Sequence, residues 1–374
     1  MVITSKLYIY IFKQLIILFL FTVGLLSAVG VAVGTLSDLA YQISNYSLPL
    51  TVAIEIFLLK IPEYVAYGLP IATLLTTLIV YGRLNRECEL IALQSVGINV
   101  YKVILPAIYL SVVIALITFI TNEAILPQAK YRISELQQPF LPETELALQR
   151  KDIFYLEYES TNNEEKQIKR LYYAKSFDGN EFNDLVILSW AENHLQQIIT
   201  AKYASWNDRL QLWNLQQGSI DRLSSDILNT DRTNFESDRI ELPNTFFFIV
   251  THESDPDVMS LAQAQKYLQL IIDSNDVNKI RLFRVRIQQK LAFPLICPIF
   301  ALIGSSLGAT FTNLNRGKSF AFCVGIAFSY YVLGFIIGSL GIAGLITPIV
   351  AAWLPNVIGL SVGCWLLWLA NCSV

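Results

Sequence analysis

The sequence predicts an α-helical membrane protein with six transmembrane helices and an antiparallel β domain inserted between the third and fourth helices. Two observations predict this class. Of the 374 residues, 54% are hydrophobic and only 15% are charged, whereas about a quarter of the residues in a soluble domain are charged. Uncharged stretches that reach or exceed the roughly 20 residues of a membrane span lie at 14–37, 64–82, 103–122, 291–315 and 319–374.

The first stretch is expected to be a retained helix, because it is longer than the core of a secretory signal and no small-x-small cleavage site ends it. The second begins after a proline-rich approach, in which Pro62 and Pro70 lie between Pro49 and Gly82. That region is too long for one straight crossing, so we expect a shallow interfacial helix, a break near Pro62, and then the span. The last stretch holds two spans if the glycine-rich 338–344 forms a turn.

Orientation follows from the basic residues of the short connections, which remain on the cytoplasmic side of a membrane. They lie before the first span, between the second and third, and between the fourth and fifth. These residues are Lys6, Lys13, Arg83, Arg86, Lys102, Arg316 and Lys318. Both termini and the charged segment 83–98 are therefore expected in the cytoplasm, and the large middle segment on the other side.

The middle segment reads as short β-branched and aromatic runs with partial alternation, separated by turn residues, which is typical of an antiparallel sandwich or jelly roll. The runs lie at 152–159, 168–177, 185–191, 195–206 and 210–220. After them, Ser260 precedes a helical pattern over 260–273, as an N-cap would. We expect spans one to three over 1–127, the β domain over 128–258, a connecting helix over 259–285, and spans four to six over 286–374.

No motif for catalysis, a cofactor or a metal ion is found. The histidines, His194 and His252, are isolated, and the five cysteines, all outside the β domain, lack metal-ligand spacing. The run Gly-Lys-Ser at 317–319 resembles the end of a phosphate loop, but Thr312 stands where that loop needs its first glycine. The chain also lacks the excess of basic residues that nucleic-acid binding needs, since its net charge is −3. Active transport would therefore need energy from a partner or an ion gradient.

Ionisable residues cluster where the second span begins, with Glu55, Lys60 and Glu63. Two interpretations remain open. In the first, the side chains simply reach interfacial water, as charged residues near span ends do. In the second, they line the outer mouth of a cavity, where Lys60 would meet an anionic headgroup.

The charged segment 83–98 also has two interpretations. Apolar or small residues recur at helical spacing, which predicts a stripe on a short helix, and Gly97 predicts its end. The stripe consists of Leu84, Cys88, Ile91, Ala92 and Ser95. A loop that only sets topology needs basic residues, whereas Glu87 and Glu89 add acidic groups. A helix with a charged and an apolar face suits docking to a cytoplasmic subunit.

In these residues the chain resembles a known family, the LptF/LptG (YjgP/YjgQ) lipopolysaccharide export permeases. The resemblance covers nearly the whole chain and depends on the order and spacing of several motifs around the β domain. They are IPEYVAYGLPIATLLTTLIVYGRLNRECELIALQSVGI at 61–98, NEAILPQAKYR at 122–132, DPDVMSLAQAQKYL at 255–268, RVRIQQKLAFPLICPIFALIGSSLGATF at 284–311, and NRGKSF, SYYVLG and ITPIVAAWLPN within 315–356.

The resemblance implies an inner-membrane permease without catalytic residues, cofactors or metal ions, with a periplasmic β-jellyroll (β-taco) domain. It implies a second permease subunit, either a paralogue or the same chain, and a cytoplasmic dimer of ABC-type ATPases. The segment 83–98 would be the coupling helix, with Glu89 in a groove of the ATPase. The coupling residues would be Arg83, Arg86, Glu87, Glu89 and Gly97.

The cargo that the resemblance implies is lipopolysaccharide or a related lipid, passed to a periplasmic bridge protein of jellyroll type. Some family members place lysines at the outer end of the first span, whereas 37–46 is acidic here. The nearest alternative cations are Lys60, Arg284 and Arg286. Two other functions stay open: a membrane-anchored scaffold or sensor with a β domain, and a gradient-driven lipid carrier.

Overall fold

The computed structural model describes most of the chain in two compact units. The described residues are 2–46, 48–137, 140, 151–160, 166–177, 181–191, 194–207, 212–223, 230–240, 256, 259–273, 277–311 and 315–372. The helical unit comprises Met1–Leu136, Asp257–Ala262 and Arg281–Val374, and the β unit comprises Gln137–Pro256 and Gln263–Ile280. Of the sequence predictions above, those that concern His252 and Thr312 lie outside the described residues.

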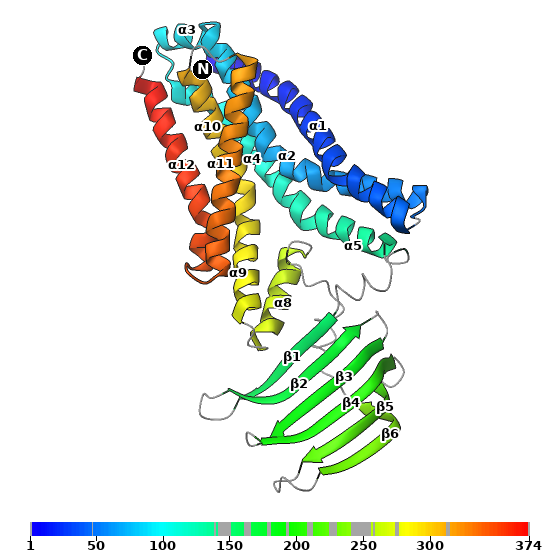
Figure 1. Ribbon diagram of the computed structural model, residues 1–374. Coiled ribbons are helices and arrows are strands. Elements are labelled where there is room, and N and C mark those ends of the chain that lie inside the picture. The colour runs from blue at the N-terminus through cyan, green and yellow to red at the C-terminus, as the bar shows by residue number, and fades with distance from the viewer. Residues whose placement is uncertain are drawn as a thin grey trace. The chain divides into compact units, whose positions relative to one another are not determined.

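The described part of the chain contains six helical segments long and apolar enough to cross a membrane, which confirms the predicted number. The helices are α1 (Val2–Tyr46), α2 (Leu50–Arg86), α3 (Glu89–Ser95), α4 (Val100–Ile120), α5 (Leu126–Gln137), α8 (Leu261–Asp273), α9 (Val277–Ala292), α10 (Ile296–Thr310), α11 (Arg316–Ile342) and α12 (Pro348–Cys372), and Figure 1 shows them in chain order. The glycine-rich turn predicted near 338–344 is also present, because α11 ends at Ile342 and Gly344 has a left-handed φ of 83°.

The predicted break near Pro62 is wrong. The helix α2 runs without interruption over 37 residues, with Pro62 and Pro70 inside it. A proline removes one backbone hydrogen bond, but helices that pack on neighbours in a membrane tolerate this loss. The prolines therefore do not separate an interfacial helix from the span.

The interior of the helical unit is built where α2 and α10 approach each other closely. A Cβ placed on Gly308 would lie 2.8 Å from the backbone nitrogen of Gly82, and one on Gly304 would lie 2.8 Å from the carbonyl oxygen of Leu74. Glycines at i and i+4 let two membrane helices bring their backbones together. On the other side of α2, the hydroxyl of Tyr81 donates to the carbonyl of Val103 on α4 at 2.8 Å.

The helix α4 continues into α5 through one π-helical turn, Thr121–Ile125, and a 3₁₀ turn, Phe293–Leu295, joins α9 to α10. Glu123, in the π turn, accepts two hydrogen bonds from the backbone N–H of Leu261, at 2.9 and 2.8 Å. The helix after Ser260 therefore begins where it was predicted, but a distant carboxylate caps it. The ammonium of Lys290 on α9 donates to the carbonyl of Met259 just before it.

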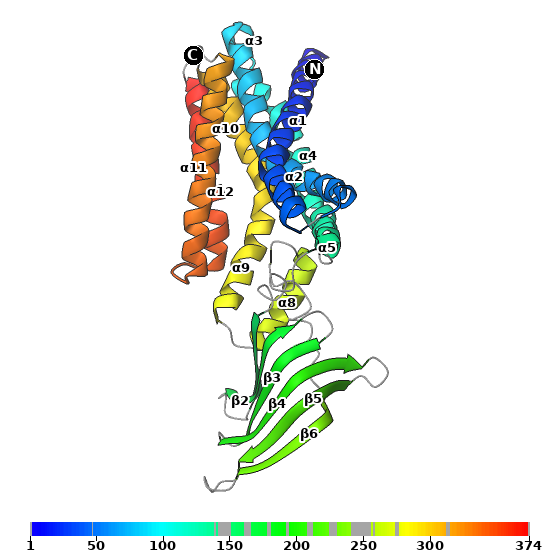
Figure 2. The ribbon, with the colours of Figure 1, turned by 45° about the vertical axis from the view of Figure 1, so that its right-hand side comes forward.

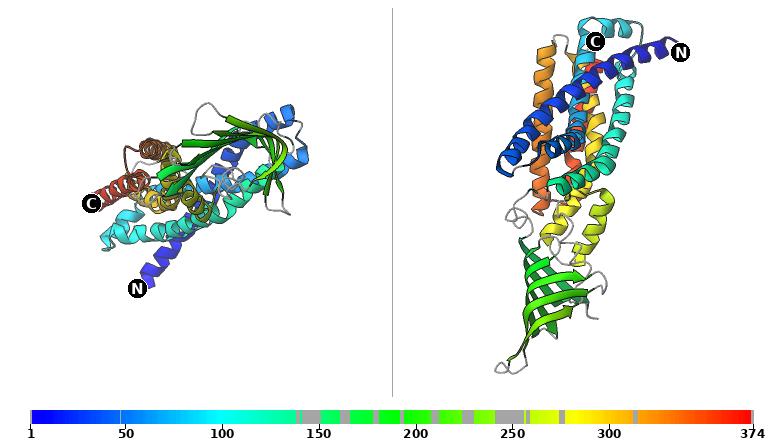
Figure 3. Two further views of the ribbon diagram at one scale, coloured as in Figure 1. Left: turned by 90° about the horizontal axis from the view of Figure 1, so that it is seen from below. Right: turned by 90° about the vertical axis from the view of Figure 1, so that its right-hand side faces the viewer.

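The β unit contains a six-stranded antiparallel sheet with the strands in chain order. The strands are β1 (Lys151–Ser160), β2 (Lys166–Phe177), β3 (Glu181–Ala191), β4 (His194–Asn207), β5 (Leu212–Leu223) and β6 (Thr230–Ile240). The sheet is curved when seen from below (Figure 3). One face carries an apolar core that includes Phe182 and Trp213, whose ring centroids lie 4.9 Å apart. The described strands form one sheet, so the two-sheet jelly roll stays a prediction.

Sequence patterns predicted five of these strands and missed β6, TDRTNFESDRI. Its residues are mostly polar, so no apolar alternation marks it. The strand pairs with β5 in regular register, from Trp213 opposite Ile240 to Leu223 opposite Thr230.

Candidate functional site

The charged segment 83–98 does not form one helix. Instead α2 ends at Arg86 and α3 begins at Glu89, and Cys88 between them has a left-handed φ of 57°. A residue with a side chain adopts this conformation at a cost, and it stops the run of helical hydrogen bonds. The direction of the chain and the phase of the side chains therefore change at Cys88.

The change of phase corrects the predicted stripe. Leu84, on α2, is buried as expected, but the other four members are exposed. The face of α3 that packs on the helical core instead carries Leu90, which is buried, and Leu93, which is partly buried. As a result, α3 and its C-cap residue present apolar side chains outward, with Ile91 48% and Val96 79% exposed.

The acidic residues of the segment lie beside this exposed apolar face. Glu87 is exposed and its carboxylate lies 3.8 Å from the guanidinium of Arg83, one helical turn earlier. Glu89 is half-buried in the first turn of α3, where a helix dipole favours a negative charge. The hydroxyl of Tyr10 on α1 donates to the Glu89 carboxylate at 3.3 Å. This tyrosine has no sequence signal, because 79 residues separate it from its partner.

The two remaining predicted coupling residues lie just before and just after α3. Arg86 is exposed at the last position of α2. Gly97 has a φ of 85°, and its N–H donates to the carbonyl of Gln94 at 2.8 Å. The predicted helix stop at Gly97 is thus confirmed, because this conformation favours glycine.

The segment is fixed to the paired helices of the interior. Asn85, buried near the end of α2, donates from its side-chain amide to the carbonyl of Ala309 on α10 at 2.7 Å. Figures 1 and 2 show α3 at the end of the helical unit where both chain termini lie. A force on α3 would therefore act directly on α2 and α10.

Three ion pairs join helices around the start of α2. Lys60 lies 3.6 Å from Asp38 on α1, Glu63 lies 3.2 Å from Lys130 on α5, and Arg132 on α5 lies 3.5 Å from Glu55. The predicted headgroup cation Lys60 therefore already faces a carboxylate. Asp38 belongs to the acidic stretch 37–46, whose pairing with α2 the sequence does not reveal.

A pocket of about 440 Å³ lies among α2, the π turn 121–125, α5 and the helices α9 to α12. Most of its lining is apolar and aromatic, and its cations are Arg286 and Lys290, one turn apart on α9. Arg286 also donates to the side chain of Gln289 at 3.3 Å. Arg284 is exposed and does not line the pocket. Of the three predicted lipid-binding cations, only Arg286 lines this pocket, and Lys290 joins it at a position that helical spacing would have indicated.

Comparisons with known proteins agree with this architecture. The chain is 20% identical over 312 residues to the lipopolysaccharide export system permease protein LptG of Haemophilus influenzae, which covers 83% of each chain. It is also 34% identical over 73 residues to an uncharacterized protein of Rickettsia prowazekii, which covers 20% of each chain.

The model of the family "Lipopolysaccharide export system permease LptF/LptG" matches residues 9–369. That match includes every helix except the first turns of α1 and the last turn of α12, together with the whole β unit. The chain therefore belongs to the LptF/LptG family of lipopolysaccharide export permeases and is a multi-pass inner-membrane protein.

Proposed function

We propose that this chain is the non-catalytic membrane subunit of an ATP-driven exporter, which extracts lipopolysaccharide or a related envelope lipid from the inner membrane. The observation that carries the proposal is the outer face of α3, where exposed apolar side chains lie beside acidic residues. Such a face has the composition of a docking site, because burial of its apolar groups and a charge-assisted contact would both stabilise a complex.

The partner at this face would be a cytoplasmic dimer of ABC-type ATPases. Glu89 would enter a groove of the ATPase and contact a donor there. Glu87, Arg83 and Arg86 would lie at the edge of the contact, and Gly97 would hold the end of α3 in place. Both termini would then be cytoplasmic and the β unit periplasmic, as the basic connections predict.

The movement of the ATPase during ATP hydrolysis would pass from α3 into the interior of the helical unit through two attachments. Leu90 and Leu93 pack α3 on the core, and Asn85 joins α2 to α10. Since α2 and α10 touch along their backbones, they would move as one body rather than bend separately. ATP hydrolysis would thereby change the space available to the lipid between this chain and a second permease subunit.

The lipid would be held at the opposite end of the helices. The pocket with Arg286 and Lys290 offers two cations above an apolar lining, which suits a phosphorylated headgroup joined to acyl chains. The β unit would then take the acyl chains and pass the lipid to a periplasmic bridge protein of jellyroll type, by pairing of strand edges. Lys60 would contribute less, because Asp38 already faces it.

The decisive experiment compares the purified complex with Glu89→Lys. The expected result is that an ATPase co-purifies with the natural chain and that ATP-dependent lipid transfer falls roughly ten- to a hundredfold in the variant, since a hydrogen bond to a charged group contributes about 1.5–3 kcal/mol.

The matched control is Glu135→Lys, a charge reversal at an exposed acid on α5, far along the chain from the docking face. Lipid transfer by this variant should stay close to that of the natural chain. If no ATPase accompanies the natural chain and export survives Glu89→Lys, the coupling role must be abandoned in favour of a scaffold or a gradient-driven carrier.

A further inference from the structure

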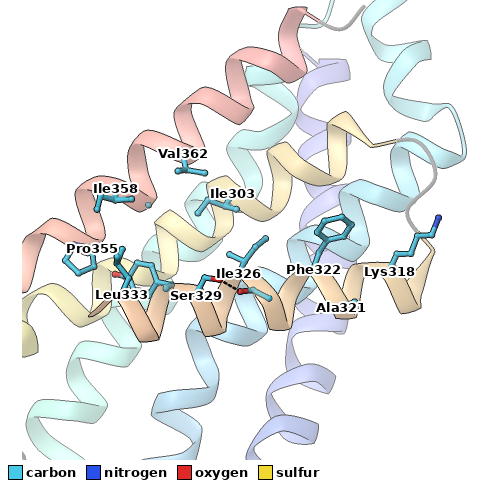
Figure 4. Close-up of a pocket in the computed structure, with 13 residues that line it drawn as sticks. Ile303, Lys318, Ala321, Phe322, Ile326, Ser329, Leu333, Pro355, Ile358 and Val362 are labelled. Carbon is cyan, nitrogen blue, oxygen red and sulfur yellow. Dashed lines mark hydrogen bonds between the residues drawn. The ribbon is translucent and has the colours of Figure 1, made fainter. Parts of the chain in front are cut away.

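A second cavity opens between α10, α11 and α12, and it adjoins the pocket around Arg286 at Tyr330 and Pro355. Its volume is about 630 Å³. We call it the α11–α12 groove. Its thirteen lining residues include Lys318, Phe322, Gly325, Ile326, Leu333 and Val362. In Figure 4 the labelled side chains of α11 form a row from Lys318 to Leu333, and those of α12 form a second row that starts beside Leu333 at Pro355 and diverges toward Val362.

The lining is apolar apart from one cation and two hydroxyls that already have partners. Ser329 donates to the carbonyl of Gly325 at 2.8 Å, and the Tyr330 hydroxyl donates to Asn356. Lys318 is exposed, and among the described residues its ammonium forms no ion pair. The groove therefore combines an apolar channel with one unneutralised positive charge at its mouth.

The length of the groove matches one leaflet of a bilayer. Lys318 and Leu333 lie 15 residues apart on α11, which corresponds to about 22 Å along the helix axis. One leaflet has a hydrocarbon depth of roughly 15 Å, with the headgroup region beyond it. A lipid whose phosphate lies at Lys318 would thus extend its acyl chain past the row of apolar side chains toward the bilayer centre.

Two glycines shape the groove in different ways. At Gly359 an added Cβ would lie 2.9 Å from the side chain of Ile299, so this glycine lets α12 approach α10 and closes the floor. At Gly325 an added Cβ would meet nothing within 4 Å, so this glycine leaves the groove open. A larger side chain at Gly325 would occupy the space without displacing a helix.

We propose that the α11–α12 groove binds one acyl chain of an anionic glycerophospholipid from the cytoplasmic leaflet, with the lipid phosphate at Lys318. The choice of leaflet rests on the proposed topology, in which Lys318 lies at the same end as α3. Such a lipid differs from the exported cargo, because the cations proposed for the cargo, Arg286 and Lys290, lie in the Val277 half of the span formed by α9 and α10, away from its Thr310 end.

The test uses the purified full-length chain in detergent, without an ATPase. Phosphatidylglycerol or phosphatidylcholine with a photoactivatable group on one acyl chain is added, and native mass spectrometry counts the lipids retained. We expect one phosphatidylglycerol per chain, crosslinked to peptides of α11 or α12. Lys318→Gln should weaken its retention roughly fivefold, the effect of one lysine near an anionic lipid, and Gly325→Leu should abolish it.

Two matched controls separate the groove from general lipid binding. Lys102→Gln removes an exposed cation at the first turn of α4, and Gly24→Leu adds a side chain on α1 where a Cβ would also meet nothing within 4 Å. Both should retain the lipid as the natural chain does. Equal retention of phosphatidylcholine, survival of binding in Gly325→Leu, or equal loss in the controls would overturn the proposal. Because the assay needs neither ATP nor export, these outcomes leave the transport function to be judged separately.

Discussion

Two pairs of membrane-spanning segments in this chain differ sharply in how much of each is buried. In the most apolar stretches of α2 and of the α9–α10 segment, 78% and 72% of the residues are buried, compared with 22% in α1 and 17% in α11. Yet among these four segments the exposed α1 has the highest mean hydropathy, and the buried α2 has the lowest. The interior instead collects small and polar residues: Thr73, Thr76, Thr77, Gly304, Ser305, Ser306 and Gly308.

The difference shows what holds a membrane protein together. Lipid tails are as apolar as leucine, so burial of apolar groups gives helices little reason to associate inside a bilayer. Close backbone contact and hydrogen bonds provide the attraction, and they need glycine, serine and threonine. The apolar surfaces of α1 and α11 are left for lipid or for a partner subunit.

The largest expected effect comes from closing the space between α2 and α10. In Gly308→Ala the new Cβ would press on backbone atoms of Gly82 and Leu78, and we expect a loss of about 3 kcal/mol in the free energy of unfolding, at the upper end of overpacking. Thermal unfolding in detergent measures it. Gly24→Ala, on the exposed α1, is the control and should not destabilise the chain. Equal effects of the two changes would refute the division into a close interior and an open surface.

Next in size is the hydrogen bond that links the interior pair near the docking face. Asn85→Leu keeps the volume but removes the donor to Ala309, which leaves a buried carbonyl without this partner. We expect the free energy of unfolding to fall by about 2 kcal/mol. Asn99→Leu, at an exposed position before α4, should change it little. Comparable stability of the two variants would show that Asn85 has no part in joining α2 and α10.

The open surface should behave in the opposite way. Phe328 on α11 is 68% exposed, so Phe328→Ala should change the stability of the single chain by less than about 0.5 kcal/mol. If the α11 surface is covered by a second permease subunit, the same change should weaken their association by at least about 1 kcal/mol. Dilution of the purified pair, followed by fluorescence of labelled subunits, measures this. An unchanged association would place Phe328 against lipid.

The smallest effect is expected at the ion pairs. Asp38 is mostly exposed, and such pairs contribute about 0.5 kcal/mol to stability. Lys60→Gln should lower the free energy of unfolding by no more than this, and the loss should be smaller at high salt because salt screens exposed charges. A larger, salt-independent loss would mean that Lys60 is buried against something beyond Asp38.

The features that sequence alone predicted are those marked by the pattern of apolar residues. Six spans follow from the thickness of the hydrocarbon core, and five of the six described strands follow from apolar alternation. The continuity of α2 through Pro62 was not predictable in this way, because the cost of a proline depends on the neighbours that pack around it. The strand β6 was missed because its pairing with β5 depends on backbone hydrogen bonds rather than on apolar side chains.

In the charged segment 83–98, too, the sequence predicted the elements but not their tertiary contacts. Its residue types predicted a helix with acidic and apolar faces, and Gly97 predicted the end. The direction of each face depended on Cys88, a residue with a side chain in a left-handed conformation, for which the sequence carries no signal. Likewise the partners Tyr10 of Glu89 and Lys130 of Glu63 lie far away in the chain, so spacing indicates neither contact.

The π-helical turn at Thr121–Ile125 carries a geometric consequence for the helix that follows it. Such a turn accommodates one more residue than an α-helical turn, so everything after it is rotated by about 100°. Deletion of one residue there would restore a regular helix and swing Lys130 and Arg132 away from Glu63 and Glu55. A bifunctional thiol crosslinker between cysteines placed at 63 and 130, where two long side chains now meet, would report this rotation, because the crosslink should form in the full-length helix and fail in the shortened one.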